Sequence, residues 1–181
     1  MPVAITGGIA EGKSTVLQML AELGYRTGSS DEVSREVYIE PDVQAALAAA
    51  AGLPVPVDRA ELRAAIAERP VLRRQVNAIM HPRIRARMRE NDAQFVEVPL
   101  LVEACLQAEY RRVWVVTCGP EEQLLRLVRR YGDEAHARAV MASQLPSSVK
   151  NAFADLTIRT NAPLEAVRDV VSEAARSFFG S

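Results

Sequence analysis

The sequence predicts an α/β domain in which a five-stranded parallel sheet is covered by helices in three layers and carries a helical insert and a helical lid. Short apolar runs of strand length recur along the chain, and helical periodicities separate them. A glycine-rich stretch joins the first apolar run to the first helical one. The 181 residues, 49% of them hydrophobic, are enough for one full core.

Four of the expected strands are apolar runs: VAIT at 3–6, FVEVPLL at 95–101, RVWVVTC at 112–118 and DLTIRT at 155–160. A fifth, short strand is expected at 25–29. Strands this apolar are typical of a parallel sheet that is buried on both faces. After the first strand, a helix is expected to end at Gly24. Its apolar face would consist of Val16, Leu17, Met19, Leu20 and Leu23.

The remaining segments divide the domain into a core, an insert and a lid. Between 31 and 92 we expect a helical insert whose helices are broken by Pro41, by GLPVPVD, by Pro70 and by HPR at 81–83. The arginine-rich helical block at 121–145 is expected to form a lid. The core of this single domain would then comprise 1–30, 93–120 and 146–181.

Composition limits the class of protein. A formal net charge of −1 argues against nucleic acid as a partner. Cys105 and Cys118 have no metal or disulfide spacing, which fits a reducing cytoplasm. No apolar stretch reaches the roughly 20 residues that cross a bilayer, so no membrane partner is expected. Lysine is nearly absent: only Lys13 and Lys150 accompany 20 arginines. These two lysines are candidates for positions that an arginine could not fill, and chance is the alternative explanation.

The glycine-rich stretch predicts a phosphate-binding loop. Gly7, Gly12, Lys13 and Ser14 fit the pattern G-x-x-x-x-G-K-[ST], between an apolar strand and an amphipathic helix. Such a loop turns backbone N–H groups toward phosphate oxygens, while the lysine reaches the β- and γ-phosphates and the Ser14 hydroxyl is offered to Mg²⁺. The residues expected to bind ATP are Gly7, Gly8, Ile9, Ala10, Glu11, Gly12, Lys13, Ser14 and Thr15. Glu11 is expected to point to solvent, because a carboxylate inside the loop would repel triphosphate.

The rest of the chain favours a small kinase over other nucleotide-binding proteins. A GTPase needs a guanine-reading N-K-x-D segment, which the sequence around Lys150 does not supply. A large ATPase would need a longer core and a second catalytic motif. In a small kinase, an insert binds the acceptor and an arginine-rich lid closes over ATP to exclude water.

Several segments, in this order and rough spacing, resemble the dephospho-coenzyme A kinase family: TGGIAEGKSTV, SSDEVSREV, VDRAELRAAI, VNAIMHPRI, VPLLVE and SQLPSSVKNAFADLTIRTNA. The resemblance spans essentially the whole chain. It implies transfer of the γ-phosphoryl of ATP, with Mg²⁺, to the ribose 3′-hydroxyl of dephospho-CoA, the last step of coenzyme A synthesis. It also implies a cytoplasmic enzyme that acts on a small molecule, as a monomer or small homo-oligomer.

Carried over by position, the resemblance assigns roles to several residues. Asp31 would be the catalytic base, although its place before a helix also fits an N-cap. Arg35, one turn later, would hold Asp31 or a phosphate. His81, before a proline expected to start a helix, would be structural or contact the acceptor indirectly. The segment after the third strand would bind the acceptor through Pro99, Leu100 and Glu103.

The resemblance also assigns residues to the donor side. Lys13 and Arg138 would be catalytic, and Arg130 and Asn161 would contact the nucleotide. Arg126 shares a helix face with Arg130, and a solvated arginine face remains an alternative for both. Gln144 and Lys150 also fall on family positions. Glu97 would either act toward Mg²⁺ or form a salt bridge.

Three departures from the family pattern keep alternatives open. Ser29 stands where the family has the first aspartate of D-A-D, Glu11 stands where a small residue is usual, and Ala162 replaces a glycine. A nucleoside or deoxynucleoside monophosphate kinase therefore remains an alternative. So does a nucleotide-binding regulatory protein without transfer activity.

Overall fold

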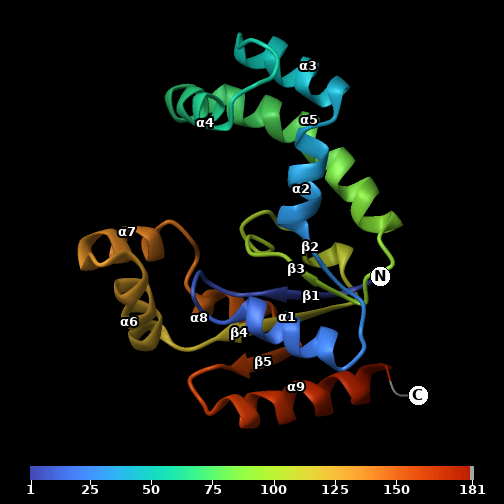
Figure 1. Ribbon diagram of the computed structural model, residues 1–181, viewed down its shortest axis with the longest axis vertical. Helices are drawn as coiled ribbons and strands as arrows, with labels where there is room; N and C mark the ends of the chain where they lie inside the picture. The colour runs from blue at the N-terminus through green and yellow to red at the C-terminus, as the bar shows by residue number, and fades with distance from the viewer. Residues whose placement is uncertain (180–181) are drawn as a thin grey trace. The chain divides into compact units, whose positions relative to one another are not determined.

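The computed structural model describes residues 1–179 and divides into two compact units (Figure 1). The first unit combines Met1–Ser29 with the chain from Asp92 onward, and the second is Ser30–Asn91. The first unit contains a sheet with helices, and the second consists of helices alone.

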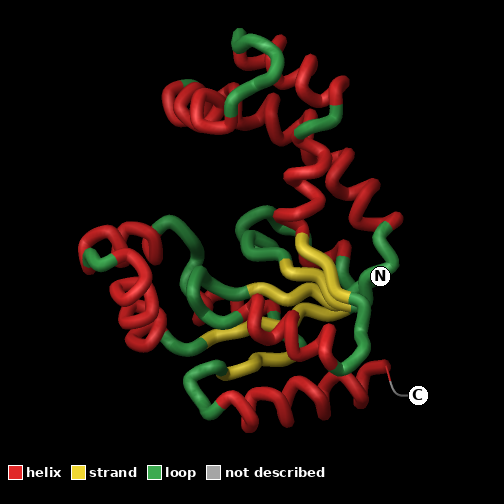
Figure 2. The backbone as a smooth tube through the Cα atoms, in the orientation of Figure 1, coloured by secondary structure: helices red, strands yellow, loops and turns green. Residues whose placement is uncertain are grey.

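The sheet of the first unit has five strands, all parallel, in the order β2-β3-β1-β4-β5 (Figure 2). Their bounds are β1 Val3–Thr6, β2 Thr27–Ser29, β3 Phe95–Glu97, β4 Arg112–Thr117 and β5 Leu156–Arg159. The predicted α/β class and the five-stranded parallel sheet are confirmed. The expected strand at 95–101 is too long, because β3 ends at Glu97 and Pro99, Leu100 and Leu101 lie in the turns that follow.

Among residues 1–179, five α-helices belong to the first unit: α1 Lys13–Glu22, α6 Pro120–Tyr131, α7 Glu134–Ala142, α8 Ser147–Lys150 and α9 Leu164–Phe179. Two short 3-10 helices, η1 Gln107–Glu109 and η2 Asn151–Phe153, precede β4 and β5. Helices α1 and α9 contact each other along one face of the sheet. Gly24, with φ of 89°, follows the end of α1 as expected, but Leu23 is 40% exposed rather than part of the buried face.

The main core lies between this sheet face and the two helices. Alternate strand residues point into it, such as Val3 and Ile5 of β1 and Trp114 of β4, because successive side chains of a strand face opposite ways. Val16 and Leu20 of α1 meet them and are fully buried. The intervening strand residues are buried too, as expected for a sheet covered on both faces.

The second unit is built on one long helix, α5 Pro70–Glu90, against which three others pack: α2 Ser30–Tyr38, α3 Pro41–Ala51 and α4 Arg59–Glu68. Pro41 and Pro70 are each the first residue of a helix, where a missing N–H costs nothing. The expected break at HPR is wrong, because Pro82 lies inside α5. Helix α5 continues past it, with Met80 and Met88 buried on either side.

Within residues 1–179, no helix is both long enough and apolar enough to cross a membrane.

Candidate functional site

The loop between β1 and α1 has the backbone that a phosphate-binding loop requires. Gly7 and Gly12 have φ of 148° and 94°, values that side chains disfavour. A Cβ on Gly7 would collide with the carbonyl oxygen of Val116, and one on Gly12 would lie 3.1 Å from the Thr160 side chain. Both glycines are therefore required for the loop to curl against β4 and the end of β5.

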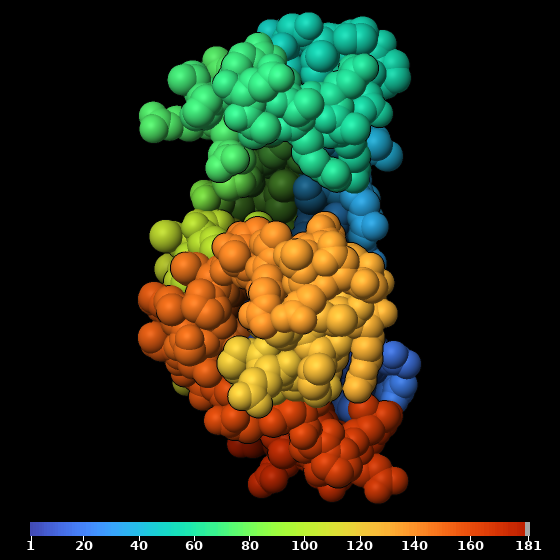
Figure 3. All heavy atoms as spheres, turned by 90° about the vertical axis from the view of Figure 1, so that its left-hand side faces the viewer, coloured from blue at the N-terminus to red at the C-terminus, as the bar shows by residue number. Residues whose placement is uncertain are grey.

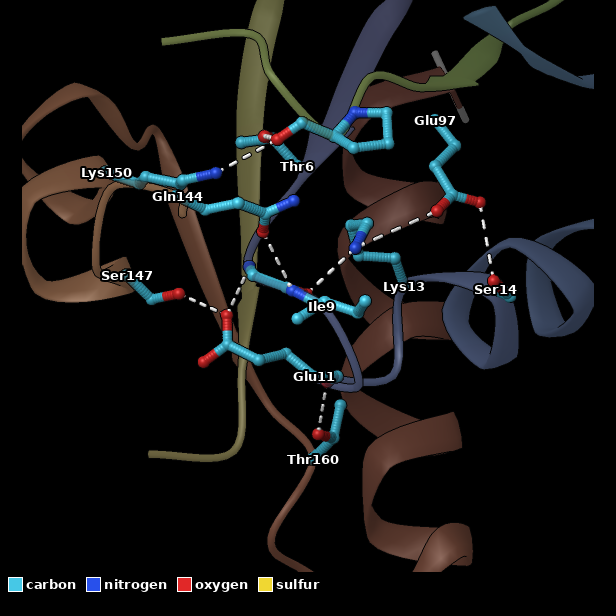
Figure 4. A network of polar contacts seen from close by, with 12 residues as sticks. Thr6, Ile9, Glu11, Lys13, Ser14, Glu97, Gln144, Ser147, Lys150 and Thr160 are labelled. Atoms are coloured by element: carbon cyan, nitrogen blue, oxygen red, sulfur yellow. Dashed lines mark hydrogen bonds and ion pairs between the residues drawn. The ribbon is translucent and has the colours of Figure 1, made fainter. Parts of the chain in front are cut away.

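Lys13 begins α1 and is 7% exposed. Its Nζ donates to the carbonyl oxygen of Gly8 at 2.9 Å and lies 3.9 Å from Oε1 of Glu97 (Figure 4). The ammonium group is thus held across the mouth of the loop, at the N-terminal end of a helix whose dipole also favours anions.

Ser14 and Glu97 place two oxygen donors side by side. Oγ of Ser14 lies 3.5 Å from Oε2 of Glu97, at the C-terminal end of β3 (Figure 4). A hydroxyl and a carboxylate are the ligands that Mg²⁺ accepts from a protein when phosphates and water complete its shell. No group of three or more His, Cys, Asp or Glu side chains in residues 1–179 forms a metal cluster.

Glu11 is buried, so the expectation that it points to solvent is wrong. It is 1% exposed, and its carboxylate accepts hydrogen bonds from the Gly8 N–H, from Oγ1 of Thr117 at 2.8 Å and from Oγ of Ser147. In Figure 4 the carboxylate points away from Lys13 and Ser14 and toward Ser147. The negative charge of Glu11 is therefore stabilised by three hydrogen-bond donors on the side of the loop away from Lys13, and it is not exposed to solvent.

Ala10 adopts a left-handed conformation, with φ of 61°. A residue with a Cβ costs roughly 1–2 kcal/mol in this region. The strain lies within the loop itself, next to the buried Glu11.

Side chains from residues 120–160 hold the outer part of the loop; residues 120–150 are yellow to orange in Figure 3. Nε2 of Gln123, on α6, donates to the carbonyl oxygen of Ile9 at 2.9 Å, and the Ile9 N–H donates to Oε1 of Gln144 at 3.1 Å. Arg126 donates to the carbonyl oxygens of Thr160, at 2.7 Å, and Ala10, at 3.4 Å. Hydrogen bonds from α6 and from the segment after α7 thus hold the loop at Ile9 and Ala10.

The other expected donor-side residues lie elsewhere on this unit. Arg130 is exposed and stacks over the ring of Tyr131, with its Cζ 5.6 Å from the ring centre. Arg138 is exposed and pairs with Glu134 at 2.6 Å, and Asn161 is exposed. Arg126, rather than Arg130 or Arg138, is the arginine that contacts the loop.

The turn after β3 is fixed by a buried lysine. Lys150 is fully buried, and its Nζ lies 2.9 Å from both the carbonyl oxygen of Pro99 and Oε1 of Glu103. Leu100 is 49% exposed. In the part of the chain that the structure describes, the buried Oε2 of Glu103 has no hydrogen-bond partner.

Cys118 follows β4 and is buried at 3% exposure. Burial, opposed by the nearby Arg126, raises the pKa of its thiol to about 11. The thiol is therefore neutral at physiological pH and is not a nucleophile.

The expected acceptor-side residues of the insert lie on α2 and α5. Helix α2 begins at Ser30, so Asp31 lies in its first turn rather than at an N-cap. Nε of Arg35 donates to the backbone carbonyl of Asp31 at 3.2 Å and leaves the Asp31 carboxylate free of that arginine. His81 is half-buried in the middle of α5, so Pro82 does not start a helix after it.

A family model described as dephospho-CoA kinase matches residues 1–165. The chain belongs to the dephospho-CoA kinase family. This match covers the loop, the insert, Arg126, Gln144 and Lys150, so the expected resemblance is confirmed over most of the chain.

Individual relatives agree with the dephospho-CoA kinase assignment. A dephospho-CoA kinase of Rhizobium meliloti is 35% identical, over 93% of this chain and 93% of the relative. One of Streptomyces avermitilis is 38% identical, over 91% of this chain and 87% of the relative. The solved structure of a dephospho-CoA kinase from Campylobacter jejuni superimposes with a TM-score of 0.72 at 22% identity, over 98% and 96% of the two chains, which supports the fold.

Sequence reasoning missed several residues that hold the loop: Thr117, Gln123, Ser147 and Thr160. Thr117 and Thr160 lie at the C-terminal ends of β4 and β5, where ligands gather in open parallel sheets. Their position at the ends of the strands could therefore have indicated that these two residues contact the loop. Gln123 carries no such signal, because only the fold of α6 turns it toward Ile9.

Proposed function

We propose that this chain transfers the γ-phosphoryl of ATP to the ribose 3′-hydroxyl of dephospho-CoA to give coenzyme A. The observation that carries the proposal is the grouping of Lys13, Ser14 and Glu97 at the phosphate loop, in a chain of the dephospho-CoA kinase family. Phosphoryl transfer depends mainly on positioning and on neutralising charge, and these side chains supply both.

On the donor side, the backbone of Gly7–Thr15 and the N-terminus of α1 would cradle the phosphates. Lys13 would neutralise the β- and γ-phosphates. Ser14 and Glu97 would hold Mg²⁺, which supplies charge neutralisation on the phosphate oxygens. Arg126 would also act on the donor side, because its guanidinium group already contacts Ala10 of the loop and Thr160. Arg130, Arg138 and Asn161 would act only after moving toward the nucleotide.

On the acceptor side, Asp31 would be the base that orients the 3′-hydroxyl and takes its proton. Its carboxylate is exposed and lies in the first turn of α2. Arg35 would contact a phosphate of the acceptor. Pro99, Leu100 and Glu103 would line the acceptor's path, with Lys150 fixing their turn, and His81 would act indirectly through the insert.

The two alternatives make different demands on the chain. A nucleoside monophosphate kinase would share the loop but would prefer a nucleotide with a free 5′-phosphate as acceptor. A regulatory protein would bind ATP without turnover. Family membership favours dephospho-CoA. The three hydrogen bonds to the Glu11 carboxylate, which points away from Lys13 (Figure 4), weaken the case for a non-transferring protein.

A coupled ADP-release assay tests the proposal, with dephospho-CoA compared against a panel of nucleoside monophosphates. We expect turnover with dephospho-CoA that depends on Mg²⁺. ATP binding without turnover on any acceptor would refute both kinase functions.

The sharper test replaces Asp31 by asparagine. We expect kcat to fall by about 10²-fold or more, as for the loss of a general base. Glu32→Gln is the matched control, because Glu32 is an exposed carboxylate in the same turn. Retained kcat in Asp31→Asn would rule Asp31 out as base.

We further propose that the enzyme works in the cytoplasm, as a monomer or small homo-oligomer. The cysteines support this location, because the exposed Cys105 and buried Cys118 are both free thiols.

A further inference from the structure

The helical insert carries two pockets that share part of their walls. The first, of about 360 Å³, is lined by Asp31, Ser34, Arg35, Arg59 and Arg63. The second, of about 180 Å³, is lined by Ser34, Tyr38, Arg59, Leu62, Arg63 and Ile66. Ser34, Arg59 and Arg63 belong to both. Because the pockets share these three residues, they form one continuous surface. Every lining residue lies on α2 or α4, so this surface lies within the insert.

The first pocket is strongly cationic, with three arginines against one aspartate. Within residues 1–179, none of these three guanidinium groups lies within 4.0 Å of a carboxylate oxygen. Arg83 and Arg87 of the same insert, by contrast, both pair with Glu40. Three guanidinium groups beside one lining carboxylate leave the pocket with an excess of positive charge, which an anionic ligand would offset.

Arg59, the first residue of α4, is also held in place. Cζ of Arg59 lies 4.5 Å from the centre of the Tyr38 ring, and the Tyr38 hydroxyl donates to the carbonyl oxygen of Val57 at 2.9 Å. Arg63 lies one turn further along α4, on the same side. Asp58, the nearest acid in sequence, is the N-cap of α4 and accepts from the N–H groups of Ala60 and Glu61. Arg59 is therefore preorganised, while Asp58 is engaged at the start of the helix.

The second pocket differs in character. Leu62 and Ile66 add aliphatic walls beyond the arginines, and the ring of Tyr38 closes one side. Along the insert the surface thus presents a carboxylate, then a group of guanidinium ions, then an apolar wall.

We propose that the arginine pocket binds the diphosphate of dephospho-CoA, with the ribose 3′-hydroxyl toward Asp31 and the pantetheine arm along Tyr38, Leu62 and Ile66. This inference rests on the function proposed above. In dephospho-CoA the ribose, the two ionised phosphates and the largely uncharged arm follow one another in that order. Guanidinium groups suit such phosphates because each donates two parallel N–H bonds.

Steady-state kinetics of the full chain test the proposal, with each substrate varied at saturating concentration of the other. For Arg59→Ala and Arg63→Ala we expect the KM for dephospho-CoA to rise about tenfold or more, as for a lost charged hydrogen bond. The KM for ATP should stay within about twofold. For Arg63→Lys, the KM for dephospho-CoA should lie between the values for Arg63→Ala and for the unaltered chain. Lysine keeps the positive charge but cannot donate the two parallel N–H bonds of a guanidinium group.

The matched control is Arg74→Ala. Arg74 is an exposed arginine of α5 that lines neither pocket, so its removal changes the charge of the insert equally without changing either KM. Ile66→Glu tests the second pocket and should raise only the KM for dephospho-CoA. Thermal unfolding of each variant identifies any that fails to fold.

A second readout is the salt dependence of dephospho-CoA binding, measured by calorimetry. Added NaCl should weaken binding to the unaltered chain and have little effect on Arg59→Ala/Arg63→Ala, because screening acts on the removed charges. A KM for dephospho-CoA that stays within about twofold in Arg59→Ala and Arg63→Ala would overturn the pocket assignment while leaving the kinase activity in place. Absence of turnover by the unaltered chain would refute the proposed function instead.

Discussion

Replacing Glu11 by alanine perturbs the phosphate loop from behind. The side chain ties the loop to the end of β4 through Thr117 and to α8 through Ser147, and it also accepts the N–H of Gly8. At 1% exposure, water cannot take its place without rearrangement. Alanine therefore leaves three buried donors without their acceptor.

The size of the effect follows from those donors. Hydrogen bonds to a charged group contribute roughly 1.5–3 kcal/mol each. The hydroxyls of Thr117 and Ser147 can rotate to other acceptors, whereas the Gly8 N–H cannot. Removing the buried charge also removes the free-energy cost of desolvating it, which offsets part of the loss in stability. We therefore expect Glu11→Ala to lower the free energy of unfolding by about 3 kcal/mol, which corresponds to roughly 9 °C in Tm for a chain of this size.

Glu11→Gln separates shape from charge. One side-chain oxygen can still accept from Gly8 and Ser147, while the amide NH₂ faces Thr117, whose hydroxyl can accept. We expect a loss of only about 1 kcal/mol. Because the carboxylate points away from Lys13 (Figure 4), the Kd for ATP should change by less than about threefold.

Urea denaturation at constant pH measures these differences, with an unchanged slope as the check on two-state unfolding. Glu173→Ala is the control, because Glu173 is an exposed carboxylate on α9. A Glu11→Ala variant within about 0.5 kcal/mol of the unaltered chain would refute the reasoning, since surface substitutions already span that range.

Three further predictions follow from the geometry of this unit. Lys150→Met should lower the free energy of unfolding by about 3 kcal/mol in urea, because it leaves Glu103 without its buried partner; recovery in Lys150→Met/Glu103→Gln would confirm the pair. Ala10→Gly should raise the free energy of unfolding by about 0.5–1 kcal/mol by relieving the left-handed backbone, and a loss would contradict that strain. At pH 8, iodoacetamide should label Cys105 and spare Cys118, because the raised pKa of Cys118, about 11, keeps that thiol protonated until the pH approaches it; peptide mapping reads out both.

The fold was predictable because its signals are local. Four of the five strands follow from short apolar runs, whereas β2 is the polar segment Thr27–Ser29. The phosphate loop follows from spacing alone. The two errors, at Pro82 and at the end of β3, have physical causes that the spacing of residues does not show. Helix α5 continues through Pro82 because buried methionines on both sides hold it, and β3 stops at Glu97 because the chain turns before Pro99.

The site was predictable where one segment builds it and less so where several meet. Lys13 and Ser14 lie in a single motif, and their positions follow from it. Glu11 was expected at the surface because a carboxylate inside the loop would repel triphosphate. Its partners, Thr117 and Ser147, lie more than 100 residues away in the chain, so the sequence did not show that they satisfy it. A buried carboxylate can be recognised only when the donors that satisfy it are known.

The burial of both lysines also determines where the folded chain can be modified. Lys13 is 7% exposed and Lys150 is 0% exposed. Amine-directed reagents should therefore leave both lysine side chains of the native protein unlabelled. Unfolding would add two new amines, so the number of labels taken up per molecule becomes a direct count of how much of the population has opened.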